Sequence, residues 1–193
     1  MFNTSSRSSV SGGGGRRVQS ITDAQLARLS QHGDRQAFGH LARRWDSRLF
    51  RFLNRLLGDE EEARDACPEA MLKAYLNIGR LRQPENFKAW IHQIALNLCR
   101  DRGRSAQVQP LVALDDGDES EAMKTPAATP TPLEHAERAD LGAVLGQVLA
   151  RLPLEQRGAI LLREIQGFNS REIATITGVP ATTVRSRIFY GLR

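Results

Sequence analysis

One long run of regularly spaced apolar residues limits what this chain can fold into. Between Asp34 and Gly58, large apolar side chains recur every three or four residues, at Phe38, Leu41, Trp45, Leu49, Phe52 and Leu56. This spacing places them on one face of an α-helix, whereas a half-buried strand would alternate at every second residue. Asp34 is a good helix N-cap, and Gly58 is a good C-terminal stop. The run therefore predicts a long amphipathic helix that needs other helices to cover its apolar face.

The neighbouring segments predict those helices. Thr22 and Gln25 fit a capping box that opens a short helix, and Asp59 and Glu62 fit another. The helix opened by the second box is expected to run to about residue 77. A fourth helix is expected from about residue 84 to 104, with a buried stripe of Phe87, Trp90, Ile91, Ile94 and Leu98.

Composition divides the chain into four parts. Residues 1–20 are rich in Ser and Gly and predict a flexible tail, and residues 21–104 predict a four-helix domain. Residues 105–136 include DDGDESEAMKTPAATPTP, which has too few apolar residues to form a core and predicts an acidic, proline-containing linker. Residues 137–193 return to helical patterning. The expected fold class is all-α, with two small helical domains joined by a flexible linker.

The second helical block contains a helix-turn-helix pattern. Asn169 and Glu172 fit a capping box for a short helix, and Gly178 permits a tight turn after it. Ala174 and Val184 supply the small residue and the buried aliphatic residue that this motif needs. The spacing therefore predicts a helix-turn-helix whose second helix ends the given sequence.

The last helix presents a polar face that suits a DNA groove. Val184 and Ile188 are expected to face inward, whereas the outward stripe consists of Thr182, Arg185, Ser186 and Phe189. Such side chains can contact base edges and thymine methyl groups, while Arg187 and Tyr190 on the flanks suit phosphates. A solvated basic helix is the alternative.

Two further surfaces are expected on the first domain. Gln93, Asn97, Arg100 and Arg104 follow one edge of the fourth helix, where they could track a nucleic-acid backbone and offer an amide to an unstacked base. The third helix has an acidic start that includes Glu62. Asp65 and Glu69 lie one turn apart, where like charges repel, which favours a basic protein partner over a merely solvated acidic face.

Other classes of function lack support in the sequence. The net charge of +5, with only three lysines among 27 basic residues, suits nucleic acid. Cys67 and Cys99 form no CxxC pair, and the histidines form no HExxH motif, so no catalytic residue, metal or cofactor is expected. We expect reduced thiols in a cytoplasmic protein. No secretory signal or apolar run of transmembrane length is present, so no membrane insertion is expected.

With these residues in view, the chain resembles bacterial sigma factors of the extracytoplasmic-function (ECF) type in the sigma-70 family. The resemblance spans about residues 22 to 193, apart from the linker. One stretch of this chain, GDRQAFGHLARRW, resembles the family's entry into region 2. Another, RDACPEAMLKAY, resembles the family's core-polymerase-binding helix. The segment that melts and holds the minus-ten element resembles FKAWIHQIALNLCRDRGR, and region 4 resembles LARLPLEQRGAILLREIQGFNSREIATITGVPATTVRSRIF.

The resemblance implies a promoter-specificity subunit without enzymatic activity or small-molecule substrate. Its partners would be core RNA polymerase, promoter DNA and an anti-sigma factor. The implied core-polymerase contacts are Asp65, Glu69 and Glu62. The implied minus-ten contacts are Asn97, Gln93, Arg100 and Arg104, with Arg80, Arg82 and Asn86 in the preceding loop. The implied minus-thirty-five contacts are Thr182, Arg185, Ser186, Arg187, Phe189 and Tyr190.

One departure bears on the third helix. Pro68 stands where the family usually has glutamine, and an internal proline removes a backbone donor and is expected to kink the helix. Two alternatives stay open: a stand-alone helix-turn-helix regulator, and a sigma-like decoy that binds its partners without melting DNA.

Overall fold

The computed structural model describes residues 21–106, 148–149 and 151–193. Over these ranges the chain is helical and contains no strand, which confirms the predicted all-α class. The tail predicted at residues 1–20, nearly all of the linker predicted at 105–136 and most of the helix that follows it lie outside the described residues.

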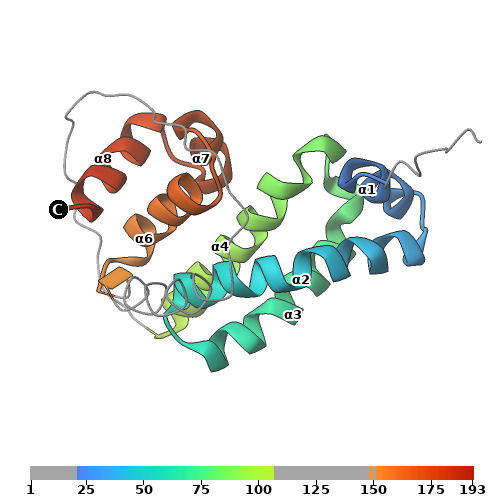
Figure 1. Ribbon diagram of the computed structural model, residues 1–193, viewed down its shortest axis with the longest axis horizontal. Helices are drawn as coiled ribbons and strands as arrows, with labels where there is room; N and C mark the ends of the chain where they lie inside the picture. Colours follow the sequence, from blue (N-terminus) through green and yellow to red (C-terminus); the bar gives the residue numbers. More distant parts are fainter. Residues whose placement is uncertain (1–20, 107–147, 150) are drawn as a thin grey trace, which may run out of the picture.

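The described helices form two lobes (Figure 1). The first lobe contains α1 (Asp23–Gln31), α2 (Arg35–Leu57), α3 (Glu60–Asn77), the 3₁₀ turns η1 (Ile78–Arg80) and η2 (Pro84–Asn86), and α4 (Phe87–Ala106). The second lobe contains α6 (Leu154–Ile160), the π-helical turn η3 (Leu161–Ile165), α7 (Ser170–Thr177) and α8 (Ala181–Gly191).

The central helix of the first lobe is α2, as its apolar spacing predicts. The Asp34 side chain accepts hydrogen bonds from the backbone N–H groups of Gln36 at 2.9 Å and Ala37 at 3.0 Å. Gly58 ends the helix with φ of 77°, in the left-handed region that favours glycine. All six residues of the predicted apolar stripe are buried. Each such side chain stabilises the fold by about 1.5–3 kcal/mol relative to exposure, so α2 organises this lobe.

Three expectations about helix ends need correction or refinement. The Thr22–Gln25 capping box is confirmed, but Asp59 only accepts a bond from the Glu62 N–H at 2.9 Å. The reciprocal half of that predicted box is wrong, because the Glu62 carboxylate is exposed and does not turn back to Asp59. The fourth helix, expected from about residue 84, begins at Phe87 because the 3₁₀ turn η2 occupies residues 84–86. The stretch LEQRGAILLREIQG, residues 154–167, also predicts one helix, which in the structure widens after α6 into η3.

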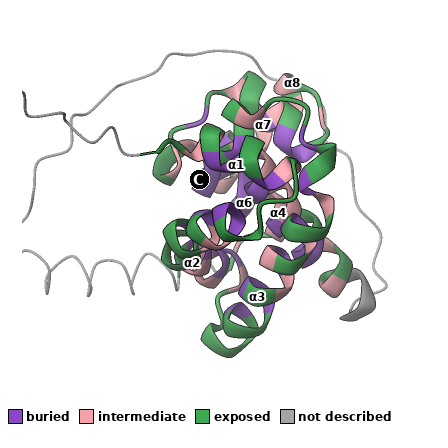
Figure 2. Ribbon diagram, turned by 90° about the vertical axis from the view of Figure 1, so that its right-hand side faces the viewer, coloured by how far each residue is buried: buried purple, intermediate pink, exposed green. Residues whose placement is uncertain are grey.

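The two lobes pack against each other (Figures 1 and 2). Buried Arg157 on α6 donates from Nη1 to the Leu56 carbonyl at 2.6 Å. Next to it, Gly158 lets α6 approach α2 and α4 closely, because a Cβ there would lie 3.0 Å from Cδ2 of Leu96. Phe168, which follows η3, packs edge-on against the buried ring of His92 with centroids 5.7 Å apart. These contacts make the described lobes one closed arrangement with a shared core.

Candidate nucleic-acid interface

The second lobe contains a helix-turn-helix formed by α7 and α8. The Asn169 side chain accepts from the N–H groups of Arg171 at 2.9 Å and Glu172 at 3.0 Å. Glu172 in turn accepts from the Asn169 N–H at 2.8 Å, which confirms the predicted capping box. Gly178 ends α7 with φ of 74°, as the tight turn requires. Val184 on α8 is fully buried, so the helix has a fixed inward face.

The opposite face of α8 reaches solvent. Its predicted members are exposed or half-buried: Thr182, Arg185, Ser186 and Phe189. Phe189 is 51% exposed, and its ring meets that of Tyr190 edge-on with centroids 5.4 Å apart. The Arg193 guanidinium lies 4.4 Å over the Phe189 ring. An exposed aromatic residue among arginines and hydroxyls can contact both thymine methyl groups and base edges.

Two arginines expected to contact DNA are instead paired with one carboxylate. From α4, Arg100 donates through Nε to Glu155 Oε1 at 2.8 Å and through Nη2 to Oε2 at 2.9 Å. From α8, Arg187 places Nη1 2.8 Å from the same Oε2, at an angle that makes the contact an ion pair rather than a hydrogen bond. We call Glu155, Arg100 and Arg187 the Glu155 clasp. It joins α4, α6 and α8, and it occupies both arginines in the closed arrangement.

Sequence reasoning missed Glu155. The residue lies 55 positions from Arg100, and no local sequence pattern predicts a contact over that separation. Both arginine side chains are only 16% exposed, and that of Glu155 is 25% exposed. The proposed DNA contacts of Arg100 and Arg187 remain predictions, and that of Arg100 requires the lobes to separate.

The polar edge of α4 is otherwise close to its expected form. Asn97 is exposed, and its Oδ1 accepts from Nη1 of Arg100 at 3.1 Å. Gln93 is half-buried, and the side chain of Arg104 lies outside the described residues. The residues predicted to extend this edge into the loop are all exposed: Arg80, Arg82 and Asn86.

The outer face of α3 combines acidic and apolar side chains. Asp65 and Glu69 are followed at seven and eleven positions from Asp65 by Leu72 and Leu76, so all four share one face. Leu72 is 56% exposed and Leu76 is 70% exposed. Sequence reasoning missed these two leucines, although their spacing from Asp65 could have identified them. Exposed leucines beside acids favour a protein partner over a merely solvated face.

Glu69 also ties this face to α4. Arg102 on α4 donates from Nη2 to Glu69 Oε2 at 2.6 Å, and Lys73 Nζ lies 3.2 Å from Oε1. The hydrogen bond from Arg102, followed by that from Lys73, lowers the pKa of Glu69. The carboxylate is therefore ionised at neutral pH and held in place. The other predicted members of this surface, Asp65 and Glu62, are exposed.

Pro68 does not divide α3 into two helices. The helix is continuous from Glu60 to Asn77, and Pro68 lies on its exposed side. Proline has no N–H to donate to the Arg64 carbonyl one turn earlier. Because this side of the helix is exposed, water can hydrogen-bond to the Arg64 carbonyl in place of the missing N–H. This explains why the helix continues through Pro68. The predicted kink stays a prediction.

Among the described residues, no group of three or more His, Cys, Asp or Glu side chains could hold a metal ion. Burial raises the pKa of the Cys67 thiol to about 11 and that of the Cys99 thiol to about 12, so both remain protonated thiols. In the same part of the chain, no helix is both long and apolar enough to span a membrane.

A helix-turn-helix with an exposed polar and aromatic face on its second helix is an architecture that DNA-binding proteins use. The family model for Sigma-70 region 2 matches residues 41–108, and the model for Sigma-70 region 4 matches residues 143–193. The chain belongs to the sigma-70 family of RNA polymerase sigma factors, within its ECF group. Members of this family are transcription initiation factors rather than enzymes.

Curated relatives resemble the chain over most of its length. The RNA polymerase sigma-H factor of Pseudomonas aeruginosa is 34% identical over 86% of this chain and 88% of its own. The ECF RNA polymerase sigma factor SigM of Mycobacterium tuberculosis is 34% identical over 91% of this chain and 83% of its own. The ECF RNA polymerase sigma-E factor of Escherichia coli K12 is 31% identical over 89% and 91%, respectively.

Two solved structures share the fold. CnrH, in complex with the cytosolic domain of CnrY, matches with a TM-score of 0.61 at 23% identity, over 88% of this chain and 92% of its own. The sigma factor RpoE of Bartonella quintana, in complex with the anti-sigma factor NepR, matches with a TM-score of 0.56 at 22% identity, over 81% and 92%.

Proposed function

We propose that this chain is the promoter-specificity subunit of a bacterial RNA polymerase, binding core polymerase and directing it to promoters. The observation that carries the proposal is the acidic and apolar outer face of α3. A stand-alone helix-turn-helix regulator has no need of that face. A subunit that must dock on a large protein does need it. The chain would thus act through binding, without catalysis, in the cytoplasm, where bacterial transcription takes place.

Three surfaces divide the work. The face of α3 docks on core polymerase through Asp65, Glu69, Leu72 and Leu76, with Glu62 at its edge. The edge of α4 holds the minus-ten element through Asn97, Gln93, Arg100 and Arg104, and the preceding loop adds Arg80, Arg82 and Asn86. The outward face of α8 reads the minus-thirty-five element through Thr182, Arg185, Ser186 and Phe189, with Arg187 and Tyr190 on phosphates. Hydroxyl, guanidinium and aromatic groups supply both base-edge and backbone contacts there.

The Glu155 clasp adds a condition to this function. Arg100 is paired with Glu155 of the other lobe, so the lobes must separate before Arg100 can bind DNA, whereas Arg187 must exchange Glu155 for DNA within its own lobe. An anti-sigma factor is the proposed inhibitory partner. The related folds of CnrH and RpoE have been solved with CnrY and the anti-sigma factor NepR, respectively, which supports a partner of that kind for this chain.

The first test is a titration of the full chain against bacterial core RNA polymerase. An Asp65→Lys/Glu69→Lys variant reverses two charges on the proposed docking face and should weaken binding at least tenfold (~1.4 kcal/mol). A Glu60→Lys/Glu164→Lys variant changes the net charge equally but alters exposed sites off that face. It should bind as the wild type does.

The outcomes separate the alternatives. Equal binding by both variants would remove α3 as the docking surface, and no binding by the wild type would leave a stand-alone regulator. Promoter-dependent run-off transcription then distinguishes a working sigma factor from a decoy. A decoy would bind core polymerase and yield no transcript.

A further inference from the structure

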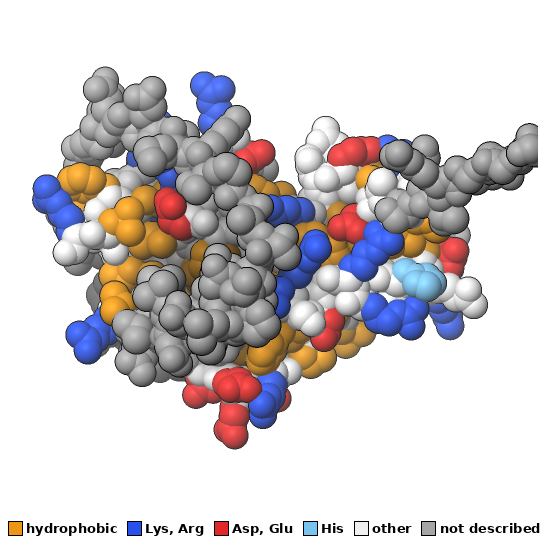
Figure 3. All heavy atoms as spheres, in the orientation of Figure 1, with side chains coloured by type: hydrophobic (Ala, Val, Ile, Leu, Met, Phe, Trp, Pro, Cys, Tyr) orange, Lys and Arg blue, Asp and Glu red, His pale blue; other side chains and the backbone are white. Residues whose placement is uncertain are grey.

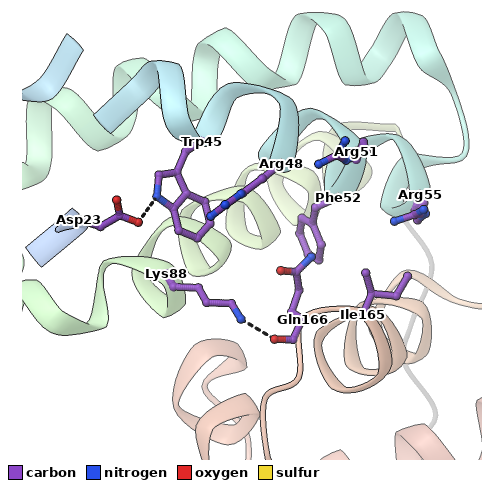
Figure 4. Close-up of a pocket in the computed structure, with 9 residues that line it drawn as sticks. All are labelled: Asp23, Trp45, Arg48, Arg51, Phe52, Arg55, Lys88, Ile165 and Gln166. Carbon is purple, nitrogen blue, oxygen red and sulfur yellow. Dashed lines mark hydrogen bonds between the residues drawn. The ribbon is translucent and has the colours of Figure 1, made fainter. Parts of the chain in front are cut away.

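A cavity of about 450 Å³ lies between the lobes, on the side of α2 away from α3 (Figure 4). Arg48, Arg51 and Arg55 line it from α2, and Lys88 lines it from α4. The opposite wall is formed by Ile165 and Gln166, at the end of η3. In Figure 3, Lys and Arg side chains gather along the notch between the two lobes. The volume lies within the range of small-molecule sites.

The charges around this cavity are not balanced. Among the residues that line it, Asp23 alone has a carboxylate, and that group already accepts from Arg44 Nη1 at 3.0 Å and Trp45 Nε1 at 2.9 Å. Arg48 lies over the Trp45 ring at 5.6 Å. Within the described residues, neither Arg48 nor its neighbour Arg51 is paired with a carboxylate. Among the described residues, the cavity therefore holds more positive than negative charge.

Lys88 adds a further cation to this cavity. Its ammonium donates to the backbone carbonyl of Gln166 and lies 4.7 Å over the Phe168 ring, so it bridges the lobes. Burial first, and the nearby positive charge of Arg48 in addition, lower the pKa of Lys88, whereas Glu172 opposes the shift. An anion in the cavity would relieve the repulsion between these cations.

The spacing of the cations indicates the shape of the anion. Arg48, Arg51 and Arg55 follow one another at three and four positions, so they span about 10 Å of the α2 axis. A single small anion cannot reach all of them, whereas a chain of linked phosphates can. Guanidinium groups bind phosphate oxygens in pairs. The rings of Trp45 and Phe52 are almost fully buried, so they offer little surface on which a base could stack.

We propose that this cavity binds a chain of condensed phosphates, either inorganic or the phosphate group of a nucleoside polyphosphate. Such a ligand would contact α2, α4 and the end of η3 together. Because Ile165 and Gln166 of the second lobe form one wall, the site is complete only in the closed arrangement. Bound phosphate therefore stabilises closure and keeps Arg100 paired with Glu155. This last consequence for promoter binding rests on the proposed function, but phosphate binding itself does not.

The test is calorimetric titration of the full chain with sodium tripolyphosphate, without polymerase or DNA. We expect one site per chain and at least tenfold weaker binding by Arg48→Ala/Arg51→Ala. The matched control is Arg35→Ala/Arg43→Ala, which removes the same charge from exposed positions of α2 outside the cavity. The control should bind as the wild type does. Both pairs lie on the surface, and circular dichroism would verify that the variants fold.

Two further arms identify the source of the phosphates. Equal affinity for ATP and tripolyphosphate would assign recognition to the phosphate chain alone, and tighter ATP binding would assign a nucleoside polyphosphate. Both results support the site. Equal loss in the two arginine variants, or no tripolyphosphate binding, overturns it. So does a result in which only a 20-base-pair DNA duplex depends on Arg48 and Arg51, since that would make the surface a nucleic-acid contact. Failure of polymerase binding would leave these results unaffected.

Discussion

Replacing Glu155 with glutamine removes the negative charge that holds an arginine from each lobe, and we expect the lobes to separate. The substitution keeps the size and shape of the side chain. It leaves Arg100 and Arg187, each 16% exposed, facing a neutral amide. The cost arises because two guanidinium groups remain partly buried without a counter-charge in the closed arrangement. Arg100, which lies on the other lobe, becomes solvated when the arrangement opens.

The free-energy cost of Glu155→Gln in the closed arrangement depends on how deeply the Glu155 clasp is buried. Removing one partner of a fully buried ion pair costs about 3–5 kcal/mol. Water reaches this site, since the Glu155 side chain is 25% exposed, and a discount to about 2 kcal/mol is appropriate. That free energy shifts the equilibrium between closed and open arrangements about 30-fold towards open.

Two measurements report the equilibrium between the closed and open arrangements. Small-angle X-ray scattering should show a larger radius of gyration for Glu155→Gln than for the wild type. Binding to a single strand that carries the minus-ten element should tighten by up to the same factor of about 30, since Arg100 can contact it only in the open arrangement. Glu164→Gln is the matched control, because among the described residues this exposed side chain pairs with its neighbour Arg163 at 3.6 Å and with no residue of the other lobe. Unchanged scattering and unchanged DNA affinity in Glu155→Gln would refute the role of the clasp.

Further predictions concern stability and readout. Burial lowers the pKa of His92 to about 4, so folding favours its neutral form. Urea denaturation should then show full stability above about pH 6.5 and a loss of up to about 3 kcal/mol as pH falls towards 4. The His92→Phe variant should lose no stability from this cause over the same pH range. A pH profile of that variant identical to that of the wild type would contradict the role of His92. Arg185→Ala should weaken promoter binding by about 1–3 kcal/mol and relax base preference without affecting core binding; unchanged selectivity in a binding-site selection would exclude direct readout. A Cβ at Gly191 would lie 2.7 Å from Cδ1 of Ile160, so Gly191→Val should cost about 1–3 kcal/mol by overpacking α6 against α8, as thermal unfolding would show.

Local features of the fold were predictable from the sequence because they depend on neighbours along the chain. The apolar spacing and the caps at Asp34 and Gly58 define α2, and Asn169 and Gly178 define the two ends of α7. The inward position of Val184 fixes the outward face of α8, so the proposed recognition face was also accessible. The π-helical turn η3 was not, since the apolar spacing along residues 154–167 predicts an ordinary α-helix.

The interlobe features could not be read from the sequence. The pairing of Arg100 with Glu155 depends on how two surfaces meet, and each surface alone shows only scattered charges. The arginine-lined cavity has the same origin, although the spacing of Arg48, Arg51 and Arg55 could have marked a basic stripe. Charge patterns on a helix identify a surface, whereas its partner depends on packing between distant elements.

The Glu155 clasp also affects how the free protein would behave inside a cell full of DNA. A chain with 27 Lys and Arg residues risks being titrated onto chromosomal phosphates, which outnumber promoters by many orders of magnitude. An arginine that is held by an internal carboxylate does not neutralise a phosphate, so DNA binding releases about one counter-ion fewer for each such arginine. Two such arginines reduce the slope of log affinity against log salt by about 1.8. The closed protein should therefore bind bulk DNA weakly and stay free to diffuse until a partner opens it.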